Sequence, residues 1–237
     1  METVKSLDAW NAYMDYQNHR MSADKQSAEE RTSEPFVTIS RQTGAGGITV
    51  GKKLVEFLRM YDRQANGPWT VFDDNLVEEV LREHHLPEKF ETFMAEESAP
   101  ELQDTIEELF GLHPSKWTLV HKTAETFMRL AHLGNVVLVG RGACVVTFKL
   151  PLGIHVRLVG SIEKRAAHLQ KYYGIGEAQA ITMIRSEDSA KRAFLKKYFN
   201  KEINDPLIYD FMINTDLVSY EDTARLIGEE ILRRRRS

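Results

Sequence analysis

Apolar residues follow two alternating patterns along the chain. Short runs dominated by apolar and β-branched residues occur at 36–39, 69–72, 135–139, 154–159 and 209–215. Such runs predict strands, and a run with little polar alternation is typical of a parallel sheet covered on both faces. Between the runs, apolar residues recur at intervals of three and four, which predicts amphipathic helices. The pattern therefore predicts an α/β fold.

The helical intervals predict helices at 50–60, 75–84, 88–97, 101–110, 115–133, 162–172, 177–185 and 220–232. Prolines at 87, 100 and 114 separate the pieces in the middle of the chain, because proline interrupts a helix. Ser219 precedes the last helix and is expected to be its N-cap.

Residues 1–34 are predicted to be an N-terminal extension outside the main domain, 35–237. Apolar side chains such as Leu7, Trp10 and Tyr13 indicate a short amphipathic helix, followed by a polar stretch up to Pro35. We expect this helix to pack on the main body or on a second subunit, so a homodimer is one assembly that would bury it. Association with a membrane surface is the alternative, although the polar face is not rich in Lys and Arg.

The stretch Ser40–Thr49 is rich in glycine and lies between a predicted strand and a predicted helix. In this arrangement, backbone N–H groups and a helix N-terminus bind phosphate. The common loop reads G-x-x-x-x-G-K-[ST], but here Gly47 stands at the lysine position and Arg41 at the position of the first glycine. A strand-to-helix turn without a ligand is the alternative. We expect a phosphate-binding loop that has lost one cation.

Two acidic residues follow the run at 69–72. The carboxyl ends of parallel strands form the crevice in which α/β sheets bind ligands, so Asp73 is a candidate to hold a metal through water or to receive a hydroxyl group. Asp74 is expected to cap the next helix. Acidic residues between 91 and 108 show no ligand spacing, and no protein-only metal site is predicted.

Arg141 lies between two glycines directly after the run at 135–139. Packing explains this placement poorly, whereas the planar guanidinium suits bidentate binding of phosphate. A salt bridge to Asp73 or Asp74 is the alternative.

Basic residues concentrate between 185 and 201, interleaved with aromatic ones. Arg185, Asp188, Lys191, Arg192 and Lys196 are spaced as neighbours on a helix, so several cations can share one face and bind an anion. A solvated basic helix and a nucleic-acid groove are the alternatives, the second disfavoured by the acidic remainder of the chain.

Composition narrows these possibilities. The chain has 237 residues, 42% of them apolar, and a formal net charge of −4, so it can bury a core and has no overall basic footprint for nucleic acid. A single cysteine, Cys144, excludes an intrachain disulfide framework and favours the cytoplasm. No membrane-spanning run is apparent. The arginines at 233–236 are expected to complement the dipole of the last helix and to aid solubility.

Taken together, these segments resemble the cytidylate kinase-like branch of the P-loop nucleoside monophosphate kinases, over residues 35–232. The resemblance is carried by Ile39–Gly47, Phe72–Asp73, Val139–Ala143, Asp205–Asp210 and Ile213–Thr215. In that branch, an SR-x-x-G-x-G-G form of the loop is usual. True cytidylate kinases carry D-G-R-D at the position of Val139–Gly142.

The resemblance implies a three-layer α/β/α P-loop NTPase fold with a five-stranded parallel sheet. It also implies a helical region for the nucleoside monophosphate near 75–133 and a helical lid near 175–205. The ATP phosphates would be bound by the loop residues Thr43, Gly44, Ala45, Gly46, Gly47, Ile48 and Thr49.

For the remaining site residues, the resemblance implies that Arg141 holds the phosphate of the acceptor. The lid residues Arg185, Asp188, Lys191 and Arg192 resemble the R-x-x-D-x-x-R pattern that closes over the transferring phosphoryl group. We expect Arg41 or a lid residue to replace the missing lysine.

The predicted activity is therefore transfer of a phosphoryl group from ATP, with Mg²⁺, to a nucleoside monophosphate, with CMP or dCMP as the first candidates. The alternatives are a kinase of another small metabolite and a nucleotide-binding regulator without efficient catalysis.

Overall fold

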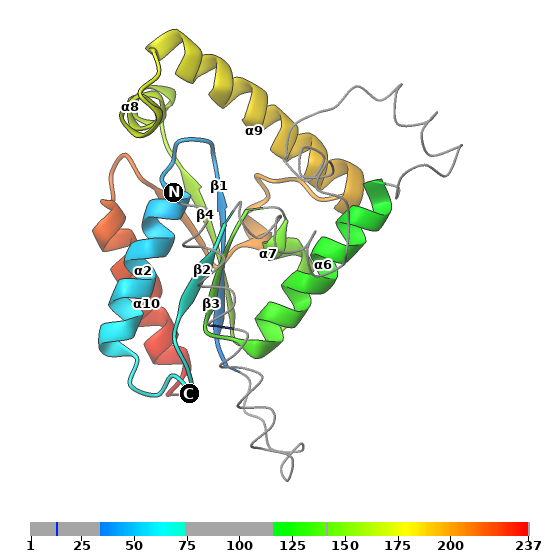
Figure 1. Cartoon of the computed structure of the whole chain (residues 1–237), viewed down its shortest axis with the longest axis vertical. Coiled ribbons are helices and arrows are strands. Elements are labelled where there is room, and N and C mark those ends of the chain that lie inside the picture. Colours follow the sequence, from blue (N-terminus) through cyan, green and yellow to red (C-terminus); the bar gives the residue numbers. More distant parts are fainter. Residues whose placement is uncertain (1–12, 14–33, 74–115, 141, 237) are drawn as a thin grey trace.

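The computed structural model describes residues 13, 34–73, 116–140 and 142–236 (Figure 1). Its centre is a parallel sheet with the order β2-β3-β1-β4-β5. The strands are β1 (Phe36–Arg41), β2 (Thr70–Phe72), β3 (Val136–Val139), β4 (Gly153–Val159) and β5 (Phe211–Asn214). The predicted five-stranded parallel sheet is confirmed, and all five strands fall within the predicted runs or within two residues of them.

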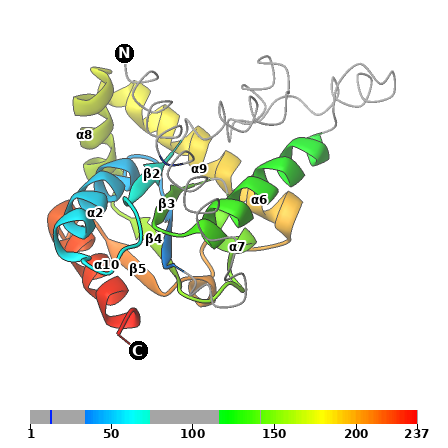
Figure 2. The same cartoon turned by 60° about the horizontal axis from the view of Figure 1, so that its bottom comes forward.

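Helices cover both faces of this sheet. The helices α2 (Gly47–Tyr61) and α10 (Tyr220–Arg234) lie on one face, and α6 (Lys116–Leu133) and α7 (Ala143–Val146) lie on the other (Figures 1 and 2). Alternate residues of each central strand serve the two layers: Val37 and Ile39 pack toward α2 and α10, whereas Phe36 packs toward α6. This two-sided burial explains why the strand sequences lack a polar face.

The helices α8 (Ile162–Tyr173) and α9 (Glu177–Phe199) lie at the carboxyl ends of the strands (Figure 1). Ser161 caps α8 through its side chain, and Gly174 ends it with a left-handed φ of 68°. The sequence predicted a helix only over 177–185, but α9 continues for 23 residues. The basic segment therefore belongs to the same rigid helix as the residues that precede it.

The last strand is shorter than predicted. Residues 206–208 form a 3-10 turn, with Asp205 as its N-cap and Pro206 in its first position, so β5 begins only at Phe211. Proline has no N–H group for a sheet ladder, which accounts for the shortening. Ser219 accepts a hydrogen bond from the N–H of Asp222, as expected of the N-cap of α10.

The amino ends of the strands are closed by a buried ion-pair cluster. The Arg235 guanidinium, whose side chain is 10% exposed, lies 2.8 Å from a carboxylate oxygen of Glu34 and 2.9 Å from one of Asp62. It also donates to the side-chain oxygen of Asn135, and Trp69 donates to Asp62. The expectation that the terminal arginines only complement the helix dipole and aid solubility is thus wrong for Arg235, because tertiary folding brings two acids to it.

Tyr13 is the described residue of segment 1–33. Its ring is buried against Phe72, and its hydroxyl donates to the carbonyl oxygen of Gly134 at 2.7 Å. The predicted helices at 75–84, 88–97 and 101–110, and Asp74, lie outside the described residues. No described helix is both long and apolar enough to cross a membrane.

Candidate functional site

The glycine-rich turn joins β1 to α2 at the carboxyl edge of the sheet. Gly44 and Gly46 both adopt left-handed backbone conformations, with φ of 81° and 82°. A Cβ atom at Gly44 would lie 2.6 Å from the carbonyl oxygen of Arg165, and one at Gly46 would lie 2.5 Å from the ring of Tyr220. Both conformation and space therefore require glycine at these two positions.

The turn leads directly into the N-terminus of α2, where Gly46 is the N-cap. Gly46 has no side chain to accept a hydrogen bond from the first N–H groups of the helix, and the first turn carries no acidic residue. The N–H groups at the start of a helix and the positive end of its dipole together favour an anion at this point. The predicted loop thus has the backbone geometry of a phosphate-binding turn.

Arg41 occupies space that two glycines leave open. A Cβ atom at Gly47 would lie 3.0 Å from Cγ of Arg41, and one at Gly140 would overlap with Arg41 Nη1. The Arg41 side chain therefore runs past the start of α2 toward the end of β3, where Gly140 has a φ of 90°. It brings a guanidinium to the loop in which the usual lysine is replaced by Gly47.

A second departure concerns the residue after the lysine position. The common loop carries Ser or Thr there to hold Mg²⁺, but this chain has Ile48. Thr49, one residue later, lines the pocket in front of the loop.

The helix α9 is bound to the loop through Thr43, which is buried. The Thr43 N–H donates to Asp188 at 2.7 Å, and its hydroxyl donates to Glu187 at 2.9 Å. The same hydroxyl accepts from the ammonium group of Lys191, which is itself 3.0 Å from Glu187. Two of the predicted lid residues, Asp188 and Lys191, thus lie against the loop.

Arg165 is a site residue that sequence reasoning missed. From α8, its Nη1 donates to the carbonyl oxygen of Thr43 at 3.1 Å and pairs with Asp188 at 2.7 Å, while Nε donates to Gly160. The buried guanidinium therefore connects the loop, α8 and α9. No motif marks this arginine in the sequence. Its position fits the helical pattern of its neighbours, so that pattern does not distinguish it from them.

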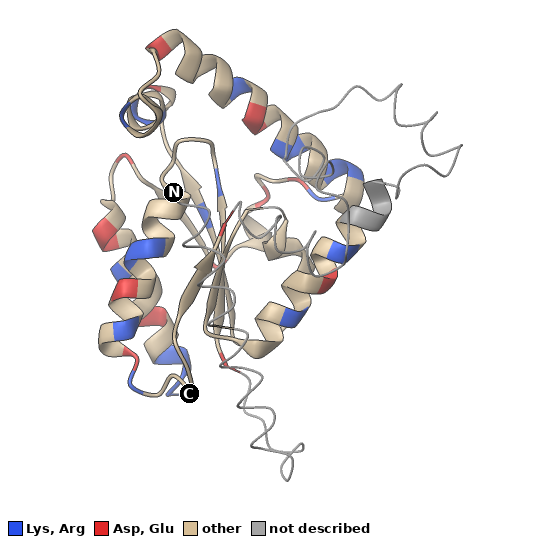
Figure 3. Ribbon diagram, viewed as in Figure 1, with Lys and Arg blue, Asp and Glu red and all other residues tan. Residues whose placement is uncertain are grey.

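The other predicted cations of the lid point elsewhere. Arg185 and Arg192 are exposed on α9 and have no hydrogen-bond or ion-pair partner among the described residues. Lys191, in contrast, is turned inward against Thr43. Figure 3 shows the basic residues distributed along α9.

The sequence also predicted Asp73 and Arg141 as site residues. Asp73 is half-buried and directly follows β2, at the same edge of the sheet. Arg141, the candidate for the acceptor phosphate, lies outside the described residues.

One pocket opens between the glycine-rich turn and α8. The loop contributes Arg41, Thr43, Gly44 and residues 46–49 to its walls. The other lining residues are His168, Leu169, Tyr172, Tyr173, Met183, Glu187 and Lys191. His168 and Tyr172 stack at a ring-centroid distance of 6.2 Å, and both tyrosines are about half exposed. Burial lowers the pKa of His168, so its ring is uncharged at neutral pH. The sequence analysis did not single out this aromatic wall.

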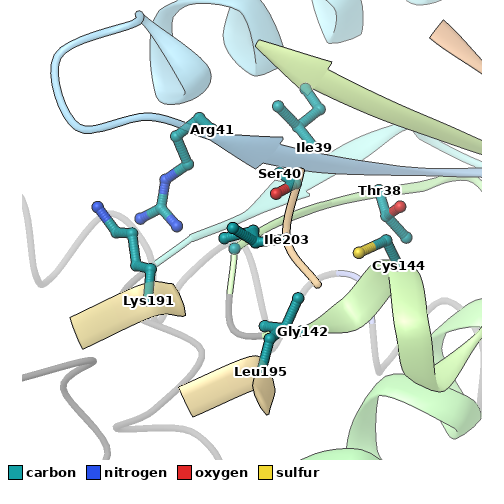
Figure 4. A pocket seen from close by; sticks show the side chains of 10 residues that line it. Thr38, Ile39, Ser40, Arg41, Gly142, Cys144, Lys191, Leu195 and Ile203 are labelled. Atoms are coloured by element: carbon teal, nitrogen blue, oxygen red, sulfur yellow. The ribbon is translucent and has the colours of Figure 1, made fainter. Parts of the chain in front are cut away.

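A second pocket lies on the other side of Arg41, between the sheet and α9 (Figure 4). Arg41 and Lys191 line it and direct their charged ends into the same space, with Ser40 beside them. Its remaining walls come from Thr38, Ile39, Gly140, Gly142, Cys144, Leu195 and Ile203. Burial raises the pKa of the Cys144 thiol to about 11 and that of Tyr209 to about 12. Both groups are therefore uncharged at neutral pH, so the cations dominate this pocket.

No three His, Cys, Asp or Glu side chains of the described residues come together as a metal site.

Comparison with known proteins adds a family and a fold. The sequence model of the cytidylate kinase-like family matches residues 36–217, whereas no curated protein matches the chain significantly. An uncharacterized protein from Eubacterium ventriosum ATCC 27560 superposes with a TM-score of 0.61 at 17% identity, over 84% of this chain and 98% of its own. At this identity the superposition shows a shared fold.

Shikimate kinases give more distant superpositions. The enzyme from Acinetobacter baumannii in complex with shikimate has a TM-score of 0.44 at 16% identity, covering 84% of this chain and 93% of its own. The enzyme from Bacteroides thetaiotaomicron has a TM-score of 0.44 at 17% identity, covering 84% and 98%.

Proposed function

Since the chain belongs to the cytidylate kinase-like family, we propose that it transfers a phosphoryl group from ATP to a nucleoside monophosphate, with CMP or dCMP as the first candidate acceptors. Family membership supports a kinase-type phosphotransferase. The choice of acceptor is our inference from the resemblance between sequence motifs.

The position of Arg41 carries this proposal. A loop without its lysine would bind phosphate but would lack the cation that neutralises charge on the transferring group. Here Gly47 and Gly140 leave room for the Arg41 side chain, and its guanidinium enters the pocket beside Lys191. A planar guanidinium can bind two phosphate oxygens at once. Arg41 is therefore suited to the role of the missing lysine.

The glycine-rich turn fits the triphosphate of ATP. The backbone at residues 43–49 is free of bulky side chains where it turns, since Gly44 and Gly46 admit no Cβ atom. Its N–H groups, with those at the start of α2, would hold the phosphates. When bound with the nucleotide, Mg²⁺ would supply further neutralisation of phosphate charge, and Asp73 and Thr49, which lie at this edge, would contact its water shell.

In the proposed reaction, the chain positions two substrates and excludes water. Lys191 and Arg41 would hold the transferring phosphoryl group from opposite sides, and Arg165 would keep α8, α9 and the loop together through Asp188. Little covalent chemistry is required of the protein, because phosphoryl transfer depends mainly on alignment and electrostatic stabilisation. Gly174 and Gly176, which have no neighbouring atoms in the way of a Cβ, are the expected hinge of the lid.

The test measures ADP formation from ATP and Mg²⁺ with a panel of ribo- and deoxyribonucleoside monophosphates, and nucleotide-induced thermal stabilisation. Turnover with CMP or dCMP supports the proposal. Turnover only with a different small phosphorylated or hydroxylated compound would assign the chain to another kinase specificity. Stabilisation by ATP without turnover would identify a nucleotide-binding regulator, and the absence of both effects would contradict a phosphate-binding role for residues 40–49.

A further inference from the structure

Arg157 is a buried arginine whose hydrogen-bond partners are neutral side chains. It lies in β4, the strand beside the central β1, and is 3% exposed. Nη1 donates to the Ser40 hydroxyl at 2.8 Å, and Nη2 donates to the Asn204 side chain at 3.3 Å. Nε is buried without a hydrogen-bond partner. Within the described part of the chain, Arg157 makes no ion pair, which is unusual because buried charges are normally paired.

The surrounding ionisable groups do not supply the missing negative charge. Burial lowers the pKa of Arg157, and the nearby charge of Arg41 acts in the same direction. Tyr209 and Cys144 are uncharged at neutral pH, since their pKa values are raised to about 12 and about 11. Asp188 acts on Arg157 only from a distance, because it is paired with Arg165. Among the residues that the structure describes, none therefore offsets the energetic cost of burying Arg157 with a directly paired negative charge.

Ser40 connects Arg157 to the pocket that Arg41 and Lys191 line. It follows Ile39 on β1, pairs in register with Arg157 and lines the pocket with its own side chain (Figure 4). Because the Ser40 oxygen accepts a charged hydrogen bond from Arg157, its own O–H becomes a stronger donor. The Tyr209 hydroxyl oxygen lies 3.3 Å from the Ser40 hydroxyl oxygen and 2.9 Å from the carbonyl oxygen of Ile203, to which it can donate its proton.

We propose that Ser40, with Arg157 behind it, is an anion-recognition element in this pocket and selects acceptors that carry a dianionic phosphate group. Ser40 donates its hydroxyl proton in a hydrogen bond to a phosphate oxygen, and Arg157 is a positioning residue that orients and polarises Ser40. The inference rests on the proposed function in one respect, because that function identifies this pocket as the one that binds the phosphoryl acceptor. It differs from that function in assigning the phosphate to β1 and β4, a contact that the sequence motifs do not mark.

The test is a calorimetric titration of the full chain, saturated with ADP and Mg²⁺ so that the glycine-rich loop is filled. Inorganic phosphate, CMP and cytidine are titrated separately. We expect phosphate and CMP to bind and cytidine to bind far more weakly. Arg157→Met and Ser40→Ala should each weaken phosphate and CMP binding about tenfold or more, the effect of losing a hydrogen bond to a charged group, and leave ADP affinity unchanged. Arg157→Lys should restore part of the loss.

Arg235→Met is the matched control, because Arg235 is also a nearly buried arginine but lies at the opposite end of the sheet with two acids. It should lower the melting temperature and leave phosphate affinity unchanged, whereas Arg157→Met should maintain or raise the melting temperature in phosphate-free buffer. Equal phosphate affinity in the parent, Arg157→Met and Ser40→Ala proteins would overturn the proposal, as would an absence of phosphate binding by the parent. If ADP fails to bind, the proposed function falls. In that case, titrating phosphate into the parent, Arg157→Met and Ser40→Ala proteins without ADP still decides the role of Ser40 and Arg157.

Discussion

The two ends of the sheet use buried arginines in opposite ways. At the amino ends of the strands, Arg235 is surrounded by the carboxylates of Glu34 and Asp62. At the carboxyl ends, Arg157 donates to neutral oxygens, and Arg41 and Lys191 enter a pocket. The first arrangement pairs one arginine with two carboxylates, whereas in the second the hydrogen-bond partners of Arg157 are neutral side chains.

This difference follows from what each end has to do. In a closed cluster of opposite charges, each charge gains its partner when the chain folds and needs no ligand. A site for phosphate must keep donors and cations available, at a cost in stability. The comparison predicts that arginine substitutions at the amino ends affect folding, whereas those at the carboxyl ends affect binding and turnover.

The largest effect is expected for Arg41→Ala. Removing the guanidinium should lower kcat by about 100- to 1,000-fold, the range observed for a lost charge-stabilising donor, while the unfolding free energy changes little. Steady-state kinetics and chemical denaturation measure the two effects. Arg63→Ala, at an exposed position after α2, is the control. A fully active Arg41→Ala protein would remove the argument for catalysis without the loop lysine.

Next in size is the stability loss of Arg235→Met. The substitution leaves Glu34 and Asp62 buried without their cation, and we expect a loss of about 3 kcal/mol in the free energy of unfolding. Urea denaturation followed by circular dichroism measures it. An unchanged midpoint would mean that this cluster does not hold the amino end together, and the contrast between the two ends would disappear.

A smaller effect is expected from restoring the common motif. In Gly47→Lys, the new side chain would compete for the space of the Arg41 stem, and we expect turnover to fall about tenfold through misalignment. The double variant Arg41→Gly, Gly47→Lys should recover part of the loss. If the single Gly47→Lys variant instead exceeds the parent in rate, Arg41 does not occupy the functional place of the lysine.

The smallest effect is expected for Thr43→Val. This change removes the hydroxyl contacts to Glu187 and Lys191 but keeps the backbone N–H bond to Asp188. Hydrogen bonds to charged groups contribute about 1.5 to 3 kcal/mol each, but Lys191 and Glu187 stay paired with each other, so KM for ATP should change severalfold with little change in kcat. Thr182→Val, at an exposed position in α9, should leave both constants unaltered.

Much of the fold could be predicted because it depends on local patterns. The apolar run at 136–139 and the glycines between 44 and 47 act through short-range geometry, and the structure places β3 and the turn where the sequence indicates them. The continuous α9 was only partly predicted. Its basic second half resembles a solvated segment until Leu195 and Ala190 are seen to be buried.

The candidate site was predictable only where a motif marks it. The loop has such a motif, which includes Ser40, but Arg165 and Arg157 have none, and each of these two acquires its role from a residue distant in sequence. Helical spacing did not show that Lys191 turns inward while Arg185 and Arg192 are exposed, because spacing gives neighbours on a helix but not the direction that a face takes in the fold.

The sequence by itself determined that strands and helices alternate, that a glycine-rich turn joins the first strand to its helix, and that the loop lacks its lysine. Backbone conformation and hydrophobic period are properties of neighbouring residues, which explains this success. Only the tertiary structure decided that Arg41 fills the space above Gly47, that Arg235 pairs with two acids and that Arg157 donates to neutral side chains. Burial and charge pairing depend on which distant segments meet, and that is settled by the packing of the sheet and its two helical layers.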